Sequence, residues 1–173
     1  AKGAIINTNF NWKKTNLEGV IVTNQSKLIL SKLTKVFDEL NREKRSINEN
    51  SLINSSSKIG TNPNIGSYVI IKENSKIGNN VDIENFVEIG KNVIIGNNCL
   101  IKSGTRIYDN TKIGDGFICH QNVIVGSDGF SFHPQNEKSI LDRLTKDDCT
   151  TEKFVRVSSV GAVEIGDDVE IGA

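Results

Sequence analysis

The chain has 173 residues, and its 36% hydrophobic content is enough for one or two domains with a buried core. Its 21 basic and 21 acidic residues balance, which argues against a nucleic-acid or anionic-membrane binder, so no nucleic-acid partner is expected. No apolar run approaches the roughly 20 residues of a membrane-spanning helix, and no secretory signal opens the chain.

Residues 1–45 lack the repeat that governs the rest of the sequence. Residues 4–6 and 19–23 are short runs of aliphatic and β-branched residues, typical of strands. From Ser26 to Leu40 the apolar residues follow helical spacing, which predicts an amphipathic helix of about four turns. We therefore interpret 1–45 as the remnant of a small, partial α/β domain.

A six-residue period begins at Ile47 and continues to Phe130. An aliphatic residue opens nearly every six, the next position is often Gly, and the fifth is small or β-branched. The opening residues are Ile47, Ile53, Ile59, Ile65, Ile71, Ile77, Ile83, Ile89, Ile95, Ile101, Ile107, Ile113, Cys119 and Val125. Such a short fixed period is typical of a parallel β-helix, in which each repeat forms one face of a coil. Antiparallel sandwiches do not keep this phase for so long.

The fourth position of the repeat predicts how the coil bends. Asn is among the few non-glycine residues that tolerate a positive φ. It occupies this position at Asn50, Asn62, Asn74, Asn80, Asn92, Asn98, Asn110 and Asn122. Three bends close a triangular coil, and successive coils stack about 4.8 Å apart. We therefore predict an all-β prism over 46–173, lined by the residue that opens each six.

The cysteines predict a reducing environment. Cys99 and Cys119 are in inward-facing register, where a thiol packs like a small apolar side chain, and Cys149 lies in a loop. Three cysteines cannot all pair internally, and this usage is typical of a cytoplasmic protein.

The two histidines, His120 and His133, are too few for a His-rich metal site, so no metal is expected. His120 stands where Gly usually stands, so its ring should point out of the bore. It is either a general base in a groove between subunits or a solvated or packed imidazole, and we favour the second reading.

The period fails over an excursion loop at 131–158. Long loops in a regular scaffold are common binding sites. The phrase from Ser127 to His133 opens this loop with two aromatics, a carboxylate and an imidazole. We predict that Asp128, Phe130 and His133 bind substrate. The alternative is that these residues pin the loop to the prism, and both can hold together.

Two phrases carry a family resemblance. Residues 125–130 (VGSDGF) precede the loop, and the prism resumes with residues 163–173 (VEIGDDVEIGA). This arrangement resembles the UDP-3-O-(3-hydroxyacyl)glucosamine N-acyltransferases of lipid A biosynthesis, which are hexapeptide-repeat acyltransferases. Residues 1–45 also look like the end of the uridine-binding domain of that family.

The resemblance implies a left-handed β-helix and a homotrimer with active sites in the grooves between prisms. It implies transfer of a 3-hydroxyacyl group from acyl carrier protein to the 2-amine of a UDP-3-O-acylglucosamine. Acyl carrier protein and the UDP-sugar are thus the expected partners, the cytoplasm the expected location, and no cofactor is expected.

In the family, the catalytic histidine follows the resumed prism by several coils, in a phrase like QIAHN. The equivalent position is expected beyond Ala173, so the catalytic residue is unknown. The phrase from His120 to Asn122 looks similar but precedes the loop, and we do not carry the catalytic role onto it. We expect a chain truncated at both ends and inactive alone.

Three other functions compete with this one. The chain could be another hexapeptide-repeat sugar O-acyltransferase, or an inactive trimeric scaffold fragment. A γ-type carbonic anhydrase would need three zinc-binding histidines around each site, and the sequence has two in total.

Overall fold

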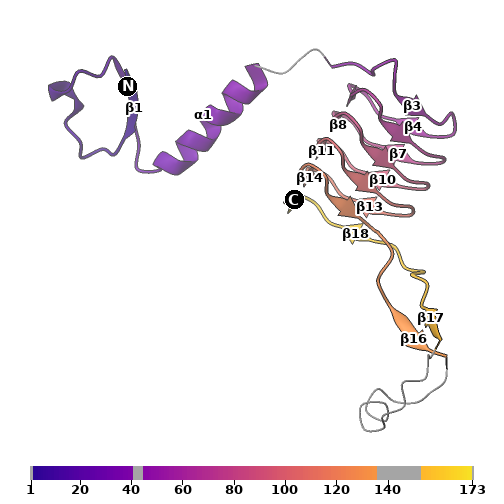
Figure 1. Ribbon diagram of the computed structural model, residues 1–173. Helices are drawn as coiled ribbons and strands as arrows, with labels where there is room; N and C mark the ends of the chain where they lie inside the picture. The colour runs from indigo at the N-terminus through magenta and orange to yellow at the C-terminus, as the bar shows by residue number, and fades with distance from the viewer. Residues whose placement is uncertain (1, 41–44, 136–152, 173) are drawn as a thin grey trace, which may run out of the picture. The chain divides into compact units, whose positions relative to one another are not determined.

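The computed structural model describes residues 2–40, 45–135 and 153–172. The chain divides into two compact units, Ala1–Lys44 and Arg45–Ala173, each of which is described by itself (Figure 1).

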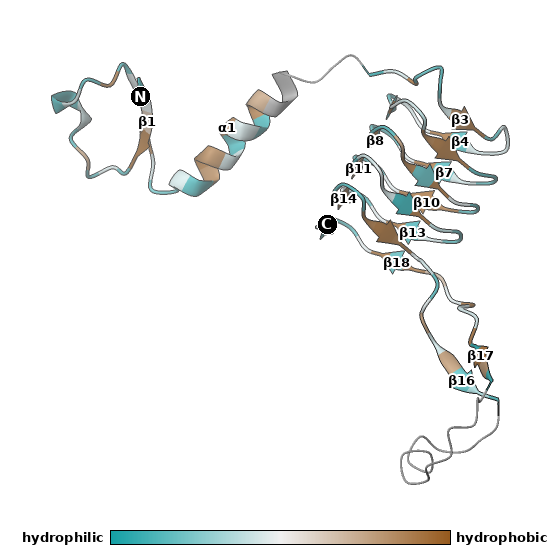
Figure 2. Ribbon diagram, viewed as in Figure 1, coloured by the Kyte–Doolittle hydropathy of each residue, from teal (hydrophilic) through white to brown (hydrophobic). Residues whose placement is uncertain are grey.

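The first unit contains two strands and a helix. The strands β1 (Gly3–Ile6) and β2 (Gly19–Val22) pair in parallel, with a 3₁₀ turn at Trp12–Lys14 between them. Helix α1 (Ser26–Leu40) follows, and hydrophobic and hydrophilic residues alternate around it (Figure 2). The predicted strands and amphipathic helix are confirmed. In the described parts of the chain, no helix is long and apolar enough to cross a membrane.

The second unit is a left-handed parallel β-helix, as predicted. Its two-residue strands stack into three parallel sheets of five, which form the faces of a prism (Figure 1). We name each face by its first strand. The β3 face contains β3 (Leu52–Ile53), β6 (Ile70–Ile71), β9 (Glu88–Ile89), β12 (Arg106–Ile107) and β15 (Ile124–Val125). The β4 face contains β4 (Lys58–Ile59), β7 (Lys76–Ile77), β10 (Ile94–Ile95), β13 (Lys112–Ile113) and β18 (Glu164–Ile165). The β5 face contains β5 (Asn64–Ile65), β8 (Asp82–Ile83), β11 (Leu100–Ile101), β14 (Ile118–Cys119) and β19 (Glu170–Ile171).

The bore of the prism is the hydrophobic core. The residues that open the repeats line it, and Ile65, Ile71, Ile83, Ile89, Ile95, Ile101 and Ile107 are each at most 2% exposed. The fifth position adds the buried side chains Val69, Val81, Val87, Val93, Cys99 and Phe117. Because strand side chains alternate, the residues on either side of each opening residue face solvent.

The bends are left-handed at most of the predicted asparagines. Positive φ values between 53° and 62° occur at Asn62, Asn74, Asn80, Asn92, Asn98, Asn110 and Asn122. Asn50 is the exception: it is not among the residues with positive φ. Its N–H instead donates to Oδ1 of Asn48 at 3.0 Å, so an Asx turn makes this first bend.

The excursion contains a hairpin. Strands β16 (Phe132–Pro134) and β17 (Phe154–Arg156) pair antiparallel, outside the stack of coils in Figure 1. The prism resumes at Val163, whose carbonyl accepts the N–H of Lys112 at 2.9 Å. Cys149, assigned to a loop from the sequence, lies outside the described residues.

Candidate functional site

Two contacts hold the base of the hairpin. The Arg156 guanidinium donates to the Asp128 carboxylate, with 2.9 Å between Nη2 and Oδ2. The N–H of Gly129 donates to Oγ of Ser159 at 2.8 Å. Both contacts join the segment that leaves the prism to the segment that returns. The carboxylate of Asp128, predicted to bind substrate, therefore also fixes where the excursion begins.

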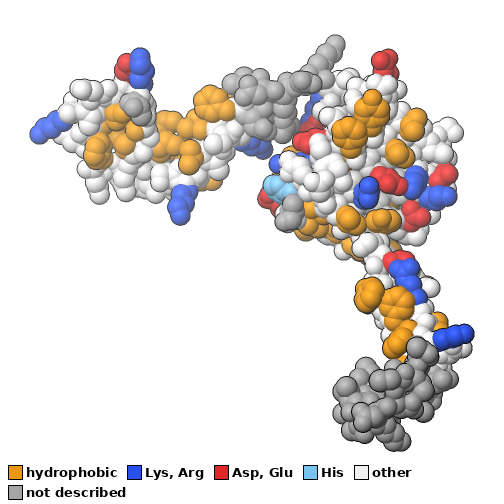
Figure 3. All heavy atoms as spheres, in the orientation of Figure 1, with side chains coloured by type: hydrophobic (Ala, Val, Ile, Leu, Met, Phe, Trp, Pro, Cys, Tyr) orange, Lys and Arg blue, Asp and Glu red, His pale blue; other side chains and the backbone are white. Residues whose placement is uncertain are grey.

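The hairpin presents hydrophobic side chains to solvent. Phe130 is 95% exposed, and its ring meets that of Phe132 edge-on, with centroids 5.0 Å apart. Phe154, Val155, Val157 and Val160 are also exposed on the returning strand and the segment after it. Figure 3 shows hydrophobic side chains gathered on this part of the chain. Exposed apolar clusters of this kind are typical of binding surfaces.

His133 lies in β16 directly after Phe132, and it is exposed. Its Nδ1 is 2.9 Å from the carbonyl oxygen of Pro134. Because a carbonyl only accepts, Nδ1 carries the hydrogen, and Nε2 of the neutral ring is an acceptor. The structure thus places Asp128, Phe130 and His133 on the outgoing side of the hairpin, and their role in binding substrate stays a prediction.

A second group lies on the β5 face. His120 directly follows β14, and its Nε2 is 2.7 Å from Oε1 of Glu170 in β19. The His120 side chain is 33% exposed, so the predicted outward orientation is confirmed. The backbone at His120 is also fixed by two hydrogen bonds. Its carbonyl accepts the Thr105 hydroxyl at 3.0 Å, and its N–H donates to the carbonyl of Ile171 at 3.0 Å. An imidazole oriented by a carboxylate can hold or transfer a proton.

The sequence did not indicate Glu170 as the partner of His120. The two residues are 50 positions apart because the excursion lies between them. The signal that could have found the pair is the register: once the frame resumes after the loop, Glu170 pairs with Ile118 on the adjacent coil.

The β3 face carries a network of ion pairs. Nζ of Lys72 is 2.6 Å from Oε1 of Glu88, and Nε of Arg106 is 4.0 Å from Oε2 of the same carboxylate. The hydrogen bond to Glu88 raises the pKa of Lys72 above its usual value. Figure 3 shows acidic and basic side chains grouped on the visible face of the prism. Two basic side chains, Lys72 and Arg106, are therefore attracted to the one carboxylate of Glu88.

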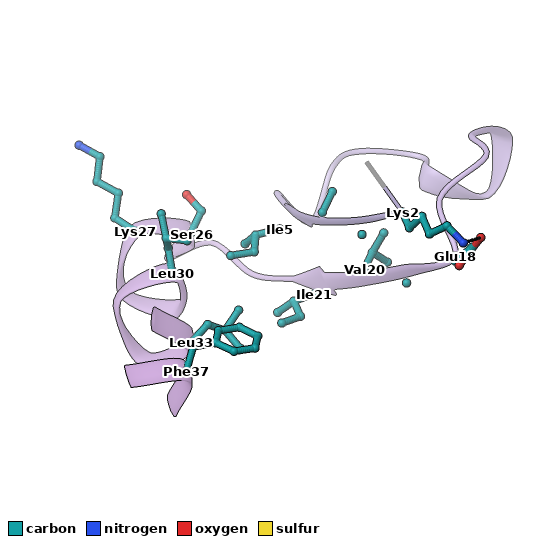
Figure 4. A pocket seen from close by; sticks show the side chains of 13 residues that line it. Lys2, Ile5, Glu18, Val20, Ile21, Ser26, Lys27, Leu30, Leu33 and Phe37 are labelled. Carbon is teal, nitrogen blue, oxygen red and sulfur yellow. Dashed lines mark ion pairs between the residues drawn. The ribbon is translucent and has the colours of Figure 1, made fainter. Parts of the chain in front are cut away.

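The first unit has an open apolar recess of about 1150 Å³. Ile5 and Ile21 line it from the strands, and Leu33 and Phe37 line it from α1 (Figure 4). The ion pair between Lys2 and Glu18, 3.1 Å apart, lies at its edge. Its walls suit an apolar group.

Within the described ranges, no group of three or more His, Cys, Asp or Glu residues could hold a metal ion.

Part of the repeat region matches a family of bacterial transferases. The family described as "Bacterial transferase hexapeptide (six repeats)" matches residues 56–91. Three proteins named UDP-3-O-acylglucosamine N-acyltransferase are similar to about a third of the chain. That of Chlorobium chlorochromatii is 38% identical over 56 residues, which cover 32% of this chain and 12% of the relative. That of Paraburkholderia phymatum is 43% identical over 56 residues, which cover 32% of this chain and 14% of the relative. That of Ruegeria pomeroyi is 43% identical over 61 residues, which cover 33% of this chain and 17% of the relative.

These relatives confirm the resemblance to UDP-3-O-acylglucosamine N-acyltransferases, and the chain spans less than a fifth of their length. Among solved structures, a variant of perosamine N-acetyltransferase from Caulobacter crescentus, in complex with CoA and GDP-perosamine, aligns with 16% identity and a TM-score of 0.27. The alignment covers 66% of this chain and 63% of that one.

Proposed function

We propose that the protein containing this chain is an N-acyltransferase that acylates the 2-amine of a UDP-3-O-acylglucosamine in lipid A biosynthesis. The observation that carries the proposal is the shared name of the relatives, which are 38–43% identical over a third of the chain. The acyl donor in this proposal is 3-hydroxyacyl acyl carrier protein, as the family resemblance implies.

The reaction is attack of a neutral amine on a thioester. A C–N bond forms, the C–S bond breaks, and the carrier thiol leaves. A base must take the amine proton, and hydrogen-bond donors must stabilise the developing oxyanion. The resemblance assigns the base to a histidine after residue 173. The exposed rings of Phe130 and Phe132 offer an apolar surface that suits an acyl chain.

The functional assembly that we propose is a homotrimer in the cytoplasm, with the active sites between prisms. The buried thiols of Cys99 and Cys119 support a reducing compartment.

The test is acyl transfer with the complete protein, 3-hydroxyacyl acyl carrier protein and UDP-3-O-acylglucosamine, followed by mass spectrometry. We expect an amide product, and none from a matched acceptor whose 2-nitrogen is already acetylated. An ester product from both acceptors would instead indicate an O-acyltransferase. No product from any 3-hydroxyacyl chain length would contradict the proposal and favour an inactive scaffold.

A further inference from the structure

The sequence contains two Asp-Gly pairs, Asp115–Gly116 and Asp128–Gly129. Glycine has no Cβ atom, so its backbone nitrogen is unshielded and its backbone turns freely. The nitrogen of such a glycine can attack the side-chain carboxyl of the aspartate before it, which makes Asp-Gly prone to form a succinimide. The first pair lies in a coil of the prism, and the second lies at the base of the hairpin.

The pair in the prism is held on both sides of the bond that would form. The Asp115 carboxylate accepts the N–H of Asn97 at 2.6 Å, and the N–H of Gly116 donates to the carbonyl of Asn97 at 2.8 Å. The hydrogen bond from the Asn97 backbone also lowers the pKa of the Asp115 carboxyl, which favours its ionised form. The N–H of Asp115 itself donates to Asp167 in the next coil at 2.8 Å. Stacked coils therefore keep both reacting groups in place.

The pair at the hairpin is held by two contacts, which we name the clasp. Oδ2 of Asp128 is 2.9 Å from Nη2 of Arg156, and the N–H of Gly129 donates to Oγ of Ser159 at 2.8 Å. Both partners lie on the returning segment, 28 and 30 residues away along the chain. The Asp128 and Arg156 side chains are 57% and 52% exposed. Because the clasp is exposed and joins the two ends of the excursion, movement of the returning segment frees both reacting groups at once.

We propose that Asp128–Gly129 is a modification site, at which opening of the clasp allows Asp128 to convert to isoaspartate. The carboxyl group first leaves the guanidinium and takes up a proton. The backbone nitrogen of Gly129 then bonds to Cγ of Asp128, and its proton leaves with the carboxyl OH as water, which closes a succinimide ring. Water next attacks the former backbone carbonyl and breaks its bond to the nitrogen, so the main chain now runs through Cβ and Cγ. The carboxyl group that this frees gives up the proton taken at the start, and the two steps balance without a further reactant.

The modification would undo the clasp that held it back. An isoaspartate adds one carbon to the main chain between residues 128 and 129, and it leaves a carboxylate directly on Cα, without the methylene that carried it toward Arg156. The same insertion displaces the N–H of Gly129 from Ser159. Because these two contacts hold the base of the hairpin, the converted chain would lose the placement of the hairpin on the prism. An age-dependent change would thus fall on the segment that is predicted to bind substrate.

The test measures isoaspartate in the 173-residue chain after storage at neutral pH and body temperature. Digestion after aromatic residues cuts at Phe117 and so places the two Asp-Gly pairs on different peptides. Chromatography with mass spectrometry, and labelling by an isoaspartyl methyltransferase, give the converted fraction of each. We expect conversion at Asp128 to be at least about tenfold faster than at Asp115 in the native chain, and the two rates to be similar in denaturant. Equal rates in the native chain would overturn the proposal.

Variants of the clasp test whether it controls the site. Ser159→Ala removes the acceptor of the Gly129 N–H, and the loss of this hydrogen bond should raise the rate at Asp128 about threefold or more. Arg156→Gln frees the carboxylate and should raise the rate too. The control is Ser158→Ala, an exposed neighbour of Ser159, which should convert at the wild-type rate. Melting temperatures show that each variant folds, and a wild-type rate in both clasp variants would refute the role of the clasp.

Gly129→Ala tests the chemistry itself. A Cβ atom at this position meets only Oγ of Ser159, at 3.4 Å, so alanine fits without breaking the clasp. Its methyl group shields the attacking nitrogen, and we expect little isoaspartate at Asp128 in this variant. Conversion at the wild-type rate would mean that the Gly129 nitrogen is not the attacking group.

Discussion

The Oδ1 atom of Asp115 occupies the space that a Cβ atom on Gly96 would need, and Gly96 lies one coil before Asp115 in the prism. From there Oδ1 accepts the N–H of Asn97 at 2.6 Å. The same arrangement joins Gly60 to Asn79, Gly66 to Asn85, Gly90 to Asp109 and Gly114 to Asp167. The glycine at the second position of a repeat therefore makes room for an Asn or Asp side chain from the next coil. That side chain accepts the backbone N–H of the residue that follows the glycine.

We predict that Gly96→Ala destabilises the prism by about 1–3 kcal/mol, as overpacking of a tight site usually does. The new methyl group would overlap Oδ1 of Asp115 and lie 2.5 Å from the carbonyl oxygen of Gly114. Because most of its close neighbours are backbone atoms, the coils cannot shift aside cheaply. Denaturant unfolding of the variant and the wild type measures the loss.

Gly166→Ala is the matched control for this change. Gly166 holds the same position of the repeat on the same face, but its strand β18 is the last of that sheet in the 173-residue chain, so a Cβ atom there meets nothing within 4 Å. In the 173-residue chain we expect the free energy of unfolding of Gly166→Ala to stay within about 0.5 kcal/mol of wild type. Equal losses in both variants would show that the cost of alanine comes from backbone conformation and not from the Asx cap.

Asp115 should make stability depend on pH. The hydrogen bonds from the Asn97 backbone N–H and then its side-chain amide lower the pKa of the Asp115 carboxyl below its usual value. A lowered folded-state pKa gives stability that is present above the unfolded value of about 3.8 and is lost as the pH falls through the folded value. Asp115→Asn keeps the Oδ1 acceptor, as Asn79 and Asn97 do, but does not titrate.

The melting temperature of wild type minus that of Asp115→Asn should therefore shrink as the pH is lowered from 6 to about 3. A difference that stays constant across this range would show that the charge of Asp115 adds nothing to the cap.

The repeat predicted the prism because its constraints are local. An inward residue every six positions and a left-handed bend can be read from neighbouring residues, and the buried Ile89 and the bend at Asn92 follow directly. The coupling between Gly96 and Asp115 spans 19 residues, which is one coil and one position. It is visible in the sequence only once the number of repeats per coil is known.

The candidate site was less predictable for the same reason. The phrase from Ser127 to His133 indicated an excursion loop but not the hairpin within it, and the partner of Asp128 is Arg156, on the far side of the excursion. Nothing in the phrase fixes the register of β16 against β17. The pairing of His120 with Glu170 likewise depends on the residue at which the prism resumes. The length of the loop alone does not identify that residue.

Cys99 and Cys119 should be unreactive in the native chain. Burial raises the pKa of both thiols, and the thiolate is the reactive form. Their exposed fractions are 1% and 0%. At pH 8 we expect alkylation of both, mapped by mass spectrometry, to be at least about a hundredfold slower in buffer than in denaturant. Rapid labelling of either residue in buffer would show that the bore opens readily.

The hairpin offers the sharpest separation of binding from stability. The ion pair between Asp128 and Arg156 is about half exposed, and pairs of this kind contribute about 0–1 kcal/mol. Phe130 is 95% exposed, so its truncation removes little packing. If both residues bind substrate, Asp128→Ala and Phe130→Ala should lower kcat/KM by about tenfold or more and shift the melting temperature by only a few degrees. Ile94→Ala is the control, since this side chain is 40% exposed on the β4 face, outside the excursion, and has no predicted role. Matching losses of activity and melting temperature in the two variants would instead mean that these residues anchor the excursion to the prism.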